Sequence, residues 1–335
     1  MNDVPQQFLN EVRQLLFKDK TSELRAYHAI RHFKRTVQIF PFKPESIQIQ
    51  THSFCNGRCL YCPYPAMSQK LKQGKMGKDM INKIADDLTK WDMTGRVTFM
   101  LQNEPLMDKD FIKIINHFKS LNPKIELATV TNGTFLTPFL INQIVHSSLD
   151  ELTISLDAFS KDTYESLHPG FKFEKILDSI HMLARKKDDR LSARLSFVNT
   201  RQNRDELSDF IKFTRKNCMG YRVIQVLNRA NNVKNYNTFR SPRLTWKYLK
   251  LRLIYKYFFQ ACFLPFIRMS ILFNGDVILC CNDWHRDAVV GNVNNESVDQ
   301  IWNGQAMNHL RKKIVEKKYH EIRTCSQCTL AQLCV

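Results

Sequence analysis

The sequence contains no apolar run of the roughly 18 residues that a membrane-spanning helix requires. Its first residues, Met1 to Asn10, also lack the basic-then-apolar pattern of a secretory signal. Both absences predict a cytoplasmic protein. Thiols stay reduced in that compartment, so the 10 cysteines are expected to bind metal rather than to form disulfides.

Acidic residues are scarce in one part of the chain. The sequence has 50 basic and 32 acidic residues, a net charge of +18, and no Asp or Glu lies between Asp209 and Asp276. Thirteen Lys and Arg residues fill that window and predict a positive field suited to an anionic partner. We favour a small-molecule substrate over a nucleic acid or a membrane surface. A solvated basic face without a partner is an equal alternative.

Short apolar segments alternate with amphipathic ones, a pattern typical of parallel βα units. The expected strands are 46–51, 96–101, 125–130, 151–156, 192–198 and 221–227. The expected helices are 78–91, 109–120, 136–146, 172–186 and 203–217. Six such units predict an α/β fold, a partial (βα)6 barrel whose chemistry lies at the C-terminal ends of the strands.

Four regions follow from this pattern. They are an N-terminal helical cap (1–45), the barrel (46–231), a linker rich in basic and aromatic residues (232–261) and a small C-terminal α+β domain (262–335). The linker is expected to pack its aromatic side chains against a neighbouring domain, and an interfacial membrane helix is the alternative.

Three cysteines follow the first expected strand within eight residues, in Cys55-Asn56-Gly57-Arg58-Cys59-Leu60-Tyr61-Cys62. Three thiolates in one loop can hold an iron–sulfur cluster and leave one iron open to a further ligand. A zinc knuckle with His52 as its fourth ligand, or a set of buried thiols, is the alternative.

This loop resembles the signature of the radical S-adenosylmethionine (SAM) family, C-x3-C-x-aromatic-C, with Tyr61 at the aromatic position. The resemblance implies a [4Fe–4S] cluster on Cys55, Cys59 and Cys62 whose open iron chelates SAM. It also implies reductive release of a 5′-deoxyadenosyl radical, with electrons from a reductase such as flavodoxin or ferredoxin.

The same resemblance assigns SAM contacts at the ends of three strands. Gln102-Asn103-Glu104-Pro105 stands where the family carries Gly-Gly-Glu-Pro, so both glycines are replaced. The SAM-binding residues implied are Gln102, Asn103, Glu104, Ser155, Asp157 and Arg229.

A second group of cysteines lies near the C-terminus, in the pattern C-x12-G-x4-C and then C-x2-C-x5-C. It resembles the SPASM/twitch extension of radical SAM enzymes. That resemblance implies one auxiliary [4Fe–4S] cluster, held by Cys262, Cys280, Cys325 and Cys328, and a zinc ribbon is the alternative. Cys281 is expected to point away from its neighbour, as in a strand.

These features together predict a radical SAM oxidoreductase or epimerase. We expect dehydrogenation or epimerisation of a sugar or aminocyclitol, with Cys218, Cys281 and Cys334 as candidate hydrogen-donating thiols. Modification of a ribosomally made peptide is the second interpretation. A non-catalytic iron–sulfur electron carrier or a nucleic-acid-binding regulator is a third, from another class.

Overall fold

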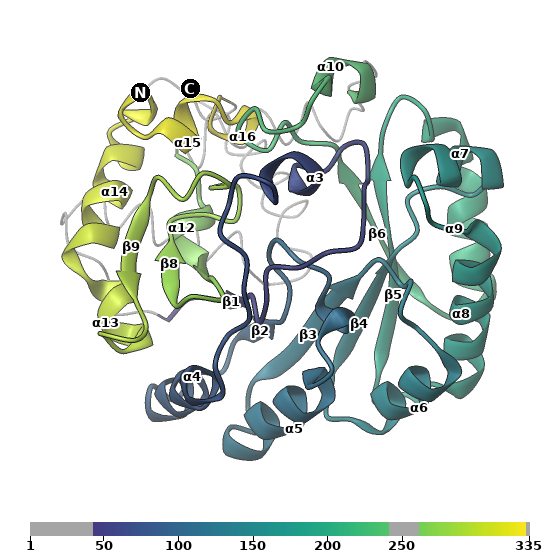
Figure 1. Cartoon of the computed structure of the whole chain (residues 1–335), viewed down its shortest axis with the longest axis horizontal. Coiled ribbons are helices and arrows are strands. Elements are labelled where there is room, and N and C mark those ends of the chain that lie inside the picture. Colours follow the sequence, from purple (N-terminus) through teal and green to yellow (C-terminus); the bar gives the residue numbers. More distant parts are fainter. Residues whose placement is uncertain (1–42, 241–260, 333–335) are drawn as a thin grey trace, which may run out of the picture.

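The computed structural model describes residues 43–240 and 261–332 (Figure 1). Most of the predicted cap and linker therefore lies outside the described residues. One nine-stranded sheet, in the order β6-β5-β4-β3-β2-β1-β7-β8-β9, organises the described chain. No helix among these residues is long and apolar enough to cross a membrane.

The first six strands form the predicted parallel barrel sheet, and each predicted strand is present within a few residues. Every neighbouring pair from β1 to β6 is parallel. The strands are β1 (Ser46–Ile49), β2 (Arg96–Thr98), β3 (Glu126–Thr131), β4 (Glu151–Ser155), β5 (Ser192–Asn199) and β6 (Gly220–Gln225).

The C-terminal strands extend the same sheet. Strand β7 (Arg268–Ile271) pairs in parallel with β1, with Ser46 opposite Arg268. Strands β8 (Asp276–Ile278) and β9 (Val289–Asn292) then add in antiparallel order. Gly275, at φ +89°, makes the turn between β7 and β8, a conformation that glycine adopts without steric cost. The second cysteine group is thus attached to the barrel through continuous backbone pairing.

Helices cover the outer face of the sheet (Figure 1). In α4, for example, Ile81, Ile84, Ala85 and Leu88 form one buried stripe at helical spacing. The barrel helices are α3 (Tyr64–Met67), α4 (Lys78–Lys90), η1 (Pro105–Met107), α5 (Phe111–Leu121), α6 (Pro138–His146), α7 (Lys161–Leu167), α8 (Phe173–Lys186), η2 (Arg204–Glu206), α9 (Leu207–Lys216) and α10 (Tyr236–Phe239). The C-terminal helices are α12 (Leu264–Ile267), α13 (Val298–Asn303), α14 (Gln305–Val315), η4 (Tyr319–Glu321), α15 (Arg323–Ser326) and α16 (Thr329–Gln332).

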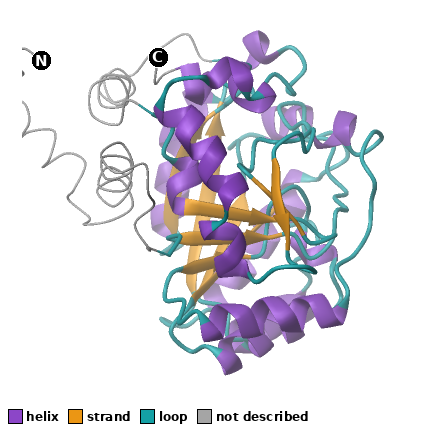
Figure 2. Cartoon of the chain, turned by 90° about the vertical axis from the view of Figure 1, so that its left-hand side faces the viewer, coloured by secondary structure: helices purple, strands orange, loops and turns teal. Residues whose placement is uncertain are grey.

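Side chains alternate across the sheet, because successive residues of a strand point to opposite faces. Ile47, Val97 and Leu127 are fully buried in the hydrophobic core. Their next neighbours along the same strands are polar or small and point to the opposite, inner face of the barrel. Figure 2 shows long loops gathered beyond the arrowheads of several strands, where the predicted site residues lie.

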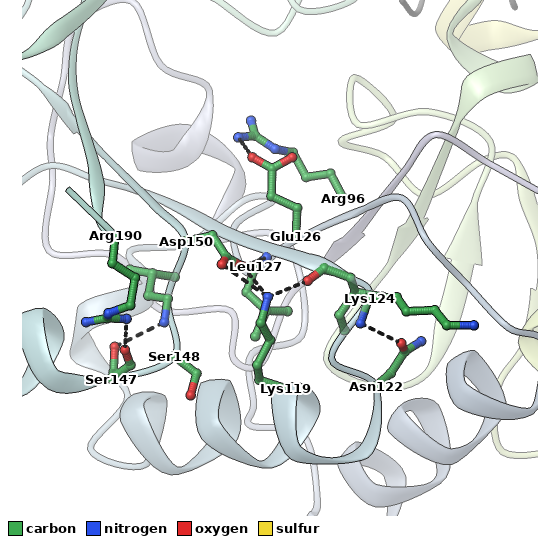
Figure 3. Close-up of polar contacts among 12 residues, drawn as sticks. Arg96, Lys119, Asn122, Lys124, Glu126, Leu127, Ser147, Ser148, Asp150 and Arg190 are labelled. Carbon is green, nitrogen blue, oxygen red and sulfur yellow. Dashed lines mark hydrogen bonds and ion pairs between the residues drawn. The ribbon is translucent and has the colours of Figure 1, made fainter.

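A polar network fixes the opposite, N-terminal ends of the strands (Figure 3). Lys119 Nζ lies 2.8 Å from Asp150 Oδ2, which also accepts the N–H of Leu127 at 2.7 Å. Arg190 donates to the backbone carbonyls of Val145 and Ser147. These contacts join the end of α5 to the starts of β3 and β4, and the end of α6 to the segment that precedes β5.

Candidate functional site

The three-cysteine loop follows β1 and wraps around Gly57. A Cβ added to Gly57 would lie 3.4 Å from Cys55 Sγ and 3.5 Å from Cys59 Sγ. The N–H of Gly57 donates to Cys55 Sγ at 3.3 Å, and the N–H of Tyr64 lies 3.5 Å from Cys62 Sγ. The loop therefore directs backbone donors at its sulfurs, which suits thiolate ligands of an iron–sulfur cluster.

Without a metal, the buried thiols of this loop stay protonated. Burial raises the pKa of Cys55 to about 12 and that of Cys59 well above its ordinary value. Binding a cluster compensates this cost, because the metal binds the thiolate form. The residues present thus fit the cluster.

His52, the alternative zinc ligand, contacts its neighbour Phe54. His52 Nδ1 accepts the N–H of Phe54 at 3.1 Å, and its ring stacks on Phe54. In residues 43–240 and 261–332, no three His, Cys, Asp or Glu side chains are close enough to hold a single metal ion.

A buried chain of hydrogen bonds joins the cysteine loop to Asp157 and His168. Tyr61, at the aromatic position of the motif, donates its hydroxyl hydrogen to Asp157 Oδ2 at 2.7 Å. The same hydroxyl lies 3.1 Å from His168 Nε2, and His168 Nδ1 lies 3.1 Å from Cys59 Sγ. Burial lowers the pKa of His168 to about 4 and raises that of Asp157 to about 6.

This network gives Asp157 a contact that the sequence did not suggest. Its other carboxylate oxygen accepts the N–H of Val198 at 2.7 Å, and the side chain is 2% exposed. Its predicted contact with SAM stays a prediction, whereas its contact with Tyr61 is part of the structure.

Glu104 joins the ends of β2 and β3. Its carboxylate accepts hydrogen bonds from Thr131 Oγ1 at 2.5 Å and from the N–H of Asn132 at 2.7 Å. Its own N–H donates to the carbonyl of Phe54 in the cysteine loop. Burial raises the pKa of Glu104 to about 7. Glu104 thus lies next to the cysteine loop, and its predicted contact with SAM stays a prediction.

The two residues that replace glycines have separate roles. Gln102 is buried, and its Nε2 lies 3.4 Å from the carbonyls of Cys281 and Asp283. Asn103 Oδ1 accepts the N–H of Leu101 at 3.2 Å. Gln102 therefore connects the barrel to the second cysteine group, a contact that glycine could not make.

Ser155 lies on the inner face at the end of β4. Its hydroxyl is 3.2 Å from the hydroxyl of Ser196 on β5. This position is compatible with a contact to a ribose, since both hydroxyls can donate and accept.

Arg229 lies between the two cysteine groups. Its guanidinium donates to Asn282 Oδ1 at 3.1 Å. Burial raises the pKa of Cys62 and of Cys328, and the positive charge of Arg229 acts to lower both values. The backbone of 229–231 is left-handed at all three residues, with φ of +49°, +55° and +63°. Such a run is strained, and it directs Arg229 toward the gap between the groups.

The second cysteine group is assembled from three segments of the chain. Cys280 interacts electrostatically with Cys262 and Cys281. Cys325 and Cys328 are buried in the adjacent turn, and Asn282 Nδ2 is 3.9 Å from Cys328 Sγ. These thiols suit the four ligands of an auxiliary iron–sulfur cluster, and none of the nine described cysteines forms a disulfide.

Cys281 differs from the expectation for a strand. Strand β8 ends at Ile278 and residues 281–282 form a turn, so side-chain alternation does not apply. The Cys280 and Cys281 thiols share a hydrogen bond, which raises the pKa of Cys280 and lowers that of Cys281. Cys281 is therefore adjacent to the auxiliary cysteines rather than turned away from them.

Asn228 joins the auxiliary segments to the barrel, and Asp283 joins two of these segments to each other. Asn228 Nδ2 donates to the carbonyl of Gln327 at 2.7 Å, and its Oδ1 accepts the N–H of Thr329 at 3.1 Å. Asp283 Oδ1 accepts the hydroxyl hydrogen of Thr324 at 2.7 Å. The segment after β6 is therefore hydrogen-bonded directly to the end of the Cys325–Cys328 turn.

The other candidate residues lie away from this region or outside the description. Cys218 is exposed in the turn that precedes β6, at the opposite end of the strand from Arg229. Cys334 lies outside the described residues.

Sequence reasoning missed His168 and Asn282. A single histidine after a short helix carries no spacing signal, and Asn282 gains its contacts only when β6 and the loop after β8 meet. The Asn-rich segment Asn228–Asn232 indicates only the turn after β6, because short polar side chains tolerate left-handed backbone.

Comparison with known proteins identifies two family segments. Residues 49–214 match the radical SAM superfamily, and residues 262–329 match the SPASM iron-sulfur cluster-binding domain. The chain is 27% identical over 188 residues to a GTP 3′,8-cyclase of Lactiplantibacillus plantarum, covering 54% of each protein. It thus spans about half the length of the GTP 3′,8-cyclases that it matches.

Longer matches cover both segments. The S-adenosyl-L-methionine-dependent 2-deoxy-scyllo-inosamine dehydrogenase of Niallia circulans is 20% identical over 84% of this chain and 91% of its own. The structure of BtrN with AdoMet and 2-DOIA superimposes with a TM-score of 0.62 at 19% identity, over 86% of this chain and 94% of BtrN. Streptococcus suis SuiB bound to precursor peptide SuiA gives a TM-score of 0.63 at 15% identity, over 91% and 74%. The two structural likenesses show the fold.

Proposed function

The chain belongs to the radical SAM superfamily and carries a C-terminal SPASM iron–sulfur domain, and from this premise we propose that it dehydrogenates a polar small molecule. The substrate is a sugar or aminocyclitol, oxidised at a carbinol carbon to the carbonyl. The cofactors are SAM, a [4Fe–4S] cluster on Cys55, Cys59 and Cys62, and one auxiliary [4Fe–4S] cluster on Cys262, Cys280, Cys325 and Cys328. The electron for SAM cleavage comes from a flavodoxin or ferredoxin.

One observation carries this proposal: Arg229 lies between the two cysteine groups. Its charge acts on Cys62 of the first group and on Cys328 of the second. Gln102 and Asn228 hold the same two regions together by direct hydrogen bonds. A substrate bound beside Arg229 is therefore close to both groups, as a two-step oxidation requires.

When bound, SAM on the first cluster would supply a hydrogen-abstracting radical, and the auxiliary cluster would supply a one-electron acceptor for the oxidation of the carbinol. The residues of the chain bind and orient the cofactors and the substrate. Glu104 and Ser155 lie on the SAM side, and Arg229 lies on the auxiliary side. The buried Tyr61–Asp157–His168 chain fixes the cysteine loop and excludes water beneath it.

The test is an anaerobic assay of the reconstituted protein with dithionite and SAM. We expect 5′-deoxyadenosine, and with a suitable aminocyclitol or sugar we expect one carbonyl product for each 5′-deoxyadenosine. Absence of SAM cleavage by protein with full iron content would contradict the radical SAM activity and favour an electron carrier. SAM cleavage with an inverted alcohol as product would favour epimerisation.

Peptide modification is a second candidate, supported by the likeness to SuiB with its precursor peptide. The same assay distinguishes the two functions, because a peptide enzyme gives no product with any sugar or aminocyclitol. A short peptide encoded next to this gene would then be the substrate to test.

A further inference from the structure

The outer side of the cysteine loop is exposed to solvent. Phe54 and Leu60 are 42% and 46% exposed, and Arg58 between them is also exposed. The cysteine between Arg58 and Leu60 faces the interior, because Cys59 Sγ lies 3.1 Å from Nδ1 of the buried His168. The exposed side chains and the sulfur are therefore on opposite sides of one stretch of backbone.

The segment that begins with α3 is held beside this loop at both of its ends. At its start, the N–H of Cys55 donates to the Tyr64 hydroxyl at 2.7 Å. At its end, the N–H of Gly74 donates to the Ser53 hydroxyl at 2.8 Å, and the Gly74 carbonyl accepts the N–H of Ser53 at 2.9 Å. Figure 1 shows the loop and α3, both in dark purple, on the near side of the sheet. Residues 68–72 thus extend the surface that the loop begins.

This surface carries unpaired positive charge. Between Glu45 and Asp79 the chain has no acidic residue and five basic ones. Three of them, Arg58, Lys70 and Lys72, are exposed and form no ion pair in the part of the chain that the structure describes.

Four carboxylates close to the loop are paired or buried. Asp108 and Asp110 pair with Lys75 at 2.7 Å and 2.8 Å, so Lys75 adds no free charge to the surface. Glu104 and Asp157, beneath the loop, are each 2% exposed. The field over the outer side of the loop is therefore positive and suits an acidic partner.

We propose that the surface formed by Phe54, Arg58, Leu60, Lys70 and Lys72 is where an acidic flavodoxin docks to reduce the first cluster. This inference rests on the proposed function, which needs an external one-electron donor. The cations attract an acidic protein, and the two apolar side chains can pack against the apolar edge of its flavin. One electron passes from the reduced flavin to the oxidised cluster, so the flavin loses the electron that the cluster gains.

The position of this surface favours such a partner. Electron transfer between proteins weakens steeply with distance, and one stretch of backbone separates the surface from the cysteine sulfurs. The contact required is small, because electron-transfer encounters bury less than about 1,200 Å² in total. A basic rim chiefly raises the association rate, which suits a partner that must dissociate after each electron.

The first measurement is anaerobic calorimetric titration of the reconstituted protein with a purified, oxidised bacterial flavodoxin, which binds without transferring electrons. The double change Lys70→Gln/Lys72→Gln lies outside the cysteine loop and should weaken binding about tenfold at low ionic strength. The difference should shrink at about 0.15 M salt, where the screening length is about 8 Å. The matched control is Arg185→Gln/Lys186→Gln at the exposed end of α8. It removes two charges near the start of β5, at the opposite end of the sheet, and should leave binding unchanged.

The second measurement compares two reductants on the same samples. With reduced flavodoxin, Lys70→Gln/Lys72→Gln should form 5′-deoxyadenosine about tenfold more slowly than the wild type. With dithionite, a small ion that needs no docking surface, the two proteins should give equal rates. Leu60→Ser should also weaken flavodoxin binding, and its iron content is measured first because Leu60 lies between two predicted cluster ligands.

Four outcomes would overturn the inference. They are equal flavodoxin binding by the wild type and Lys70→Gln/Lys72→Gln, an equal loss in the control variant, self-association of the chain that the Lys70→Gln/Lys72→Gln change abolishes, and tighter binding of an acidic ferredoxin at the same residues. The third outcome would assign the surface to a second copy of the chain, and the fourth to ferredoxin. Absence of SAM cleavage with dithionite contradicts the proposed function alone, since the titration with oxidised flavodoxin still reports docking.

Discussion

His168 Nδ1 lies 3.1 Å from Cys59 Sγ, and the opposite ring nitrogen lies 3.1 Å from the Tyr61 hydroxyl. Once Cys59 is a thiolate ligand it has no hydrogen to donate, so a hydrogen bond at this contact needs Nδ1–H as the donor. Hydrogen bonds to cluster sulfurs are among the features that set the reduction potential. His168 is therefore a positioning residue for the first cluster.

Replacing His168 by Phe should shift the midpoint potential of the first cluster to more negative values. The donor that stabilises the reduced, more negative cluster is lost, while the aromatic volume is kept. The measurement is a redox titration monitored by electron paramagnetic resonance. His146→Phe, an exposed change at the end of α6, is the control. An unchanged midpoint potential in His168→Phe would show that this contact has no electronic effect.

Iron content should divide equally between the two cysteine groups. Reconstituted protein should hold about eight irons, as two four-iron clusters. The triple change of Cys55, Cys59 and Cys62 to Ala should leave about four irons and abolish SAM cleavage. Cys218→Ala removes an exposed thiol and should change neither value. Stoichiometric zinc in place of iron would disprove the cluster assignment.

Loss of the auxiliary cluster should uncouple SAM cleavage from product formation. In Cys280→Ala the first cluster keeps its three ligands, so 5′-deoxyadenosine should still form, at least slowly. Carbonyl product should fall to little or none, because the electron acceptor is missing. Chromatography of both products from one reaction gives the ratio, after iron analysis and circular dichroism confirm an intact barrel. Product at the wild-type rate would make the second group purely structural.

Glu104 should make the protein less stable as the pH rises. Burial raises its pKa from 4.5 to about 7, so the folded state binds more protons than the unfolded state between these values. The free energy of unfolding then falls through that window and is constant above it, by about 3 kcal/mol for a shift of this size. The wild type should exceed Glu104→Gln in Tm by more at pH 5 than at pH 7.5.

The control for this prediction is Asp86→Asn, on the exposed side of α4. Its Tm difference from the wild type should not change between the two pH values. A difference for Glu104→Gln that is equally independent of pH would show that the carboxyl does not titrate in this window.

The sequence by itself determined the barrel and its two cysteine groups. Apolar periodicity is a local property, so strands such as β3 and β5 and helices such as α4 and α8 could be predicted within a few residues. The spacing of Cys55, Cys59 and Cys62 is also local, since one loop of eight residues supplies all three thiols. Glu104 could be located by its position after a strand.

The tertiary structure decided how these parts meet. Pairing of β7 with β1 joins residues 222 positions apart, such as Ser46 and Arg268, and no local pattern encodes it. The contacts of His168 with Cys59 and of Gln102 with Cys281 likewise depend on loops from different strands reaching one end of the sheet. Arg229 reaches Asn282 because the segment after β6 and the loop after β8 meet. Charge composition predicted an anionic partner, whereas only the fold placed this basic side chain beside the second cysteine group.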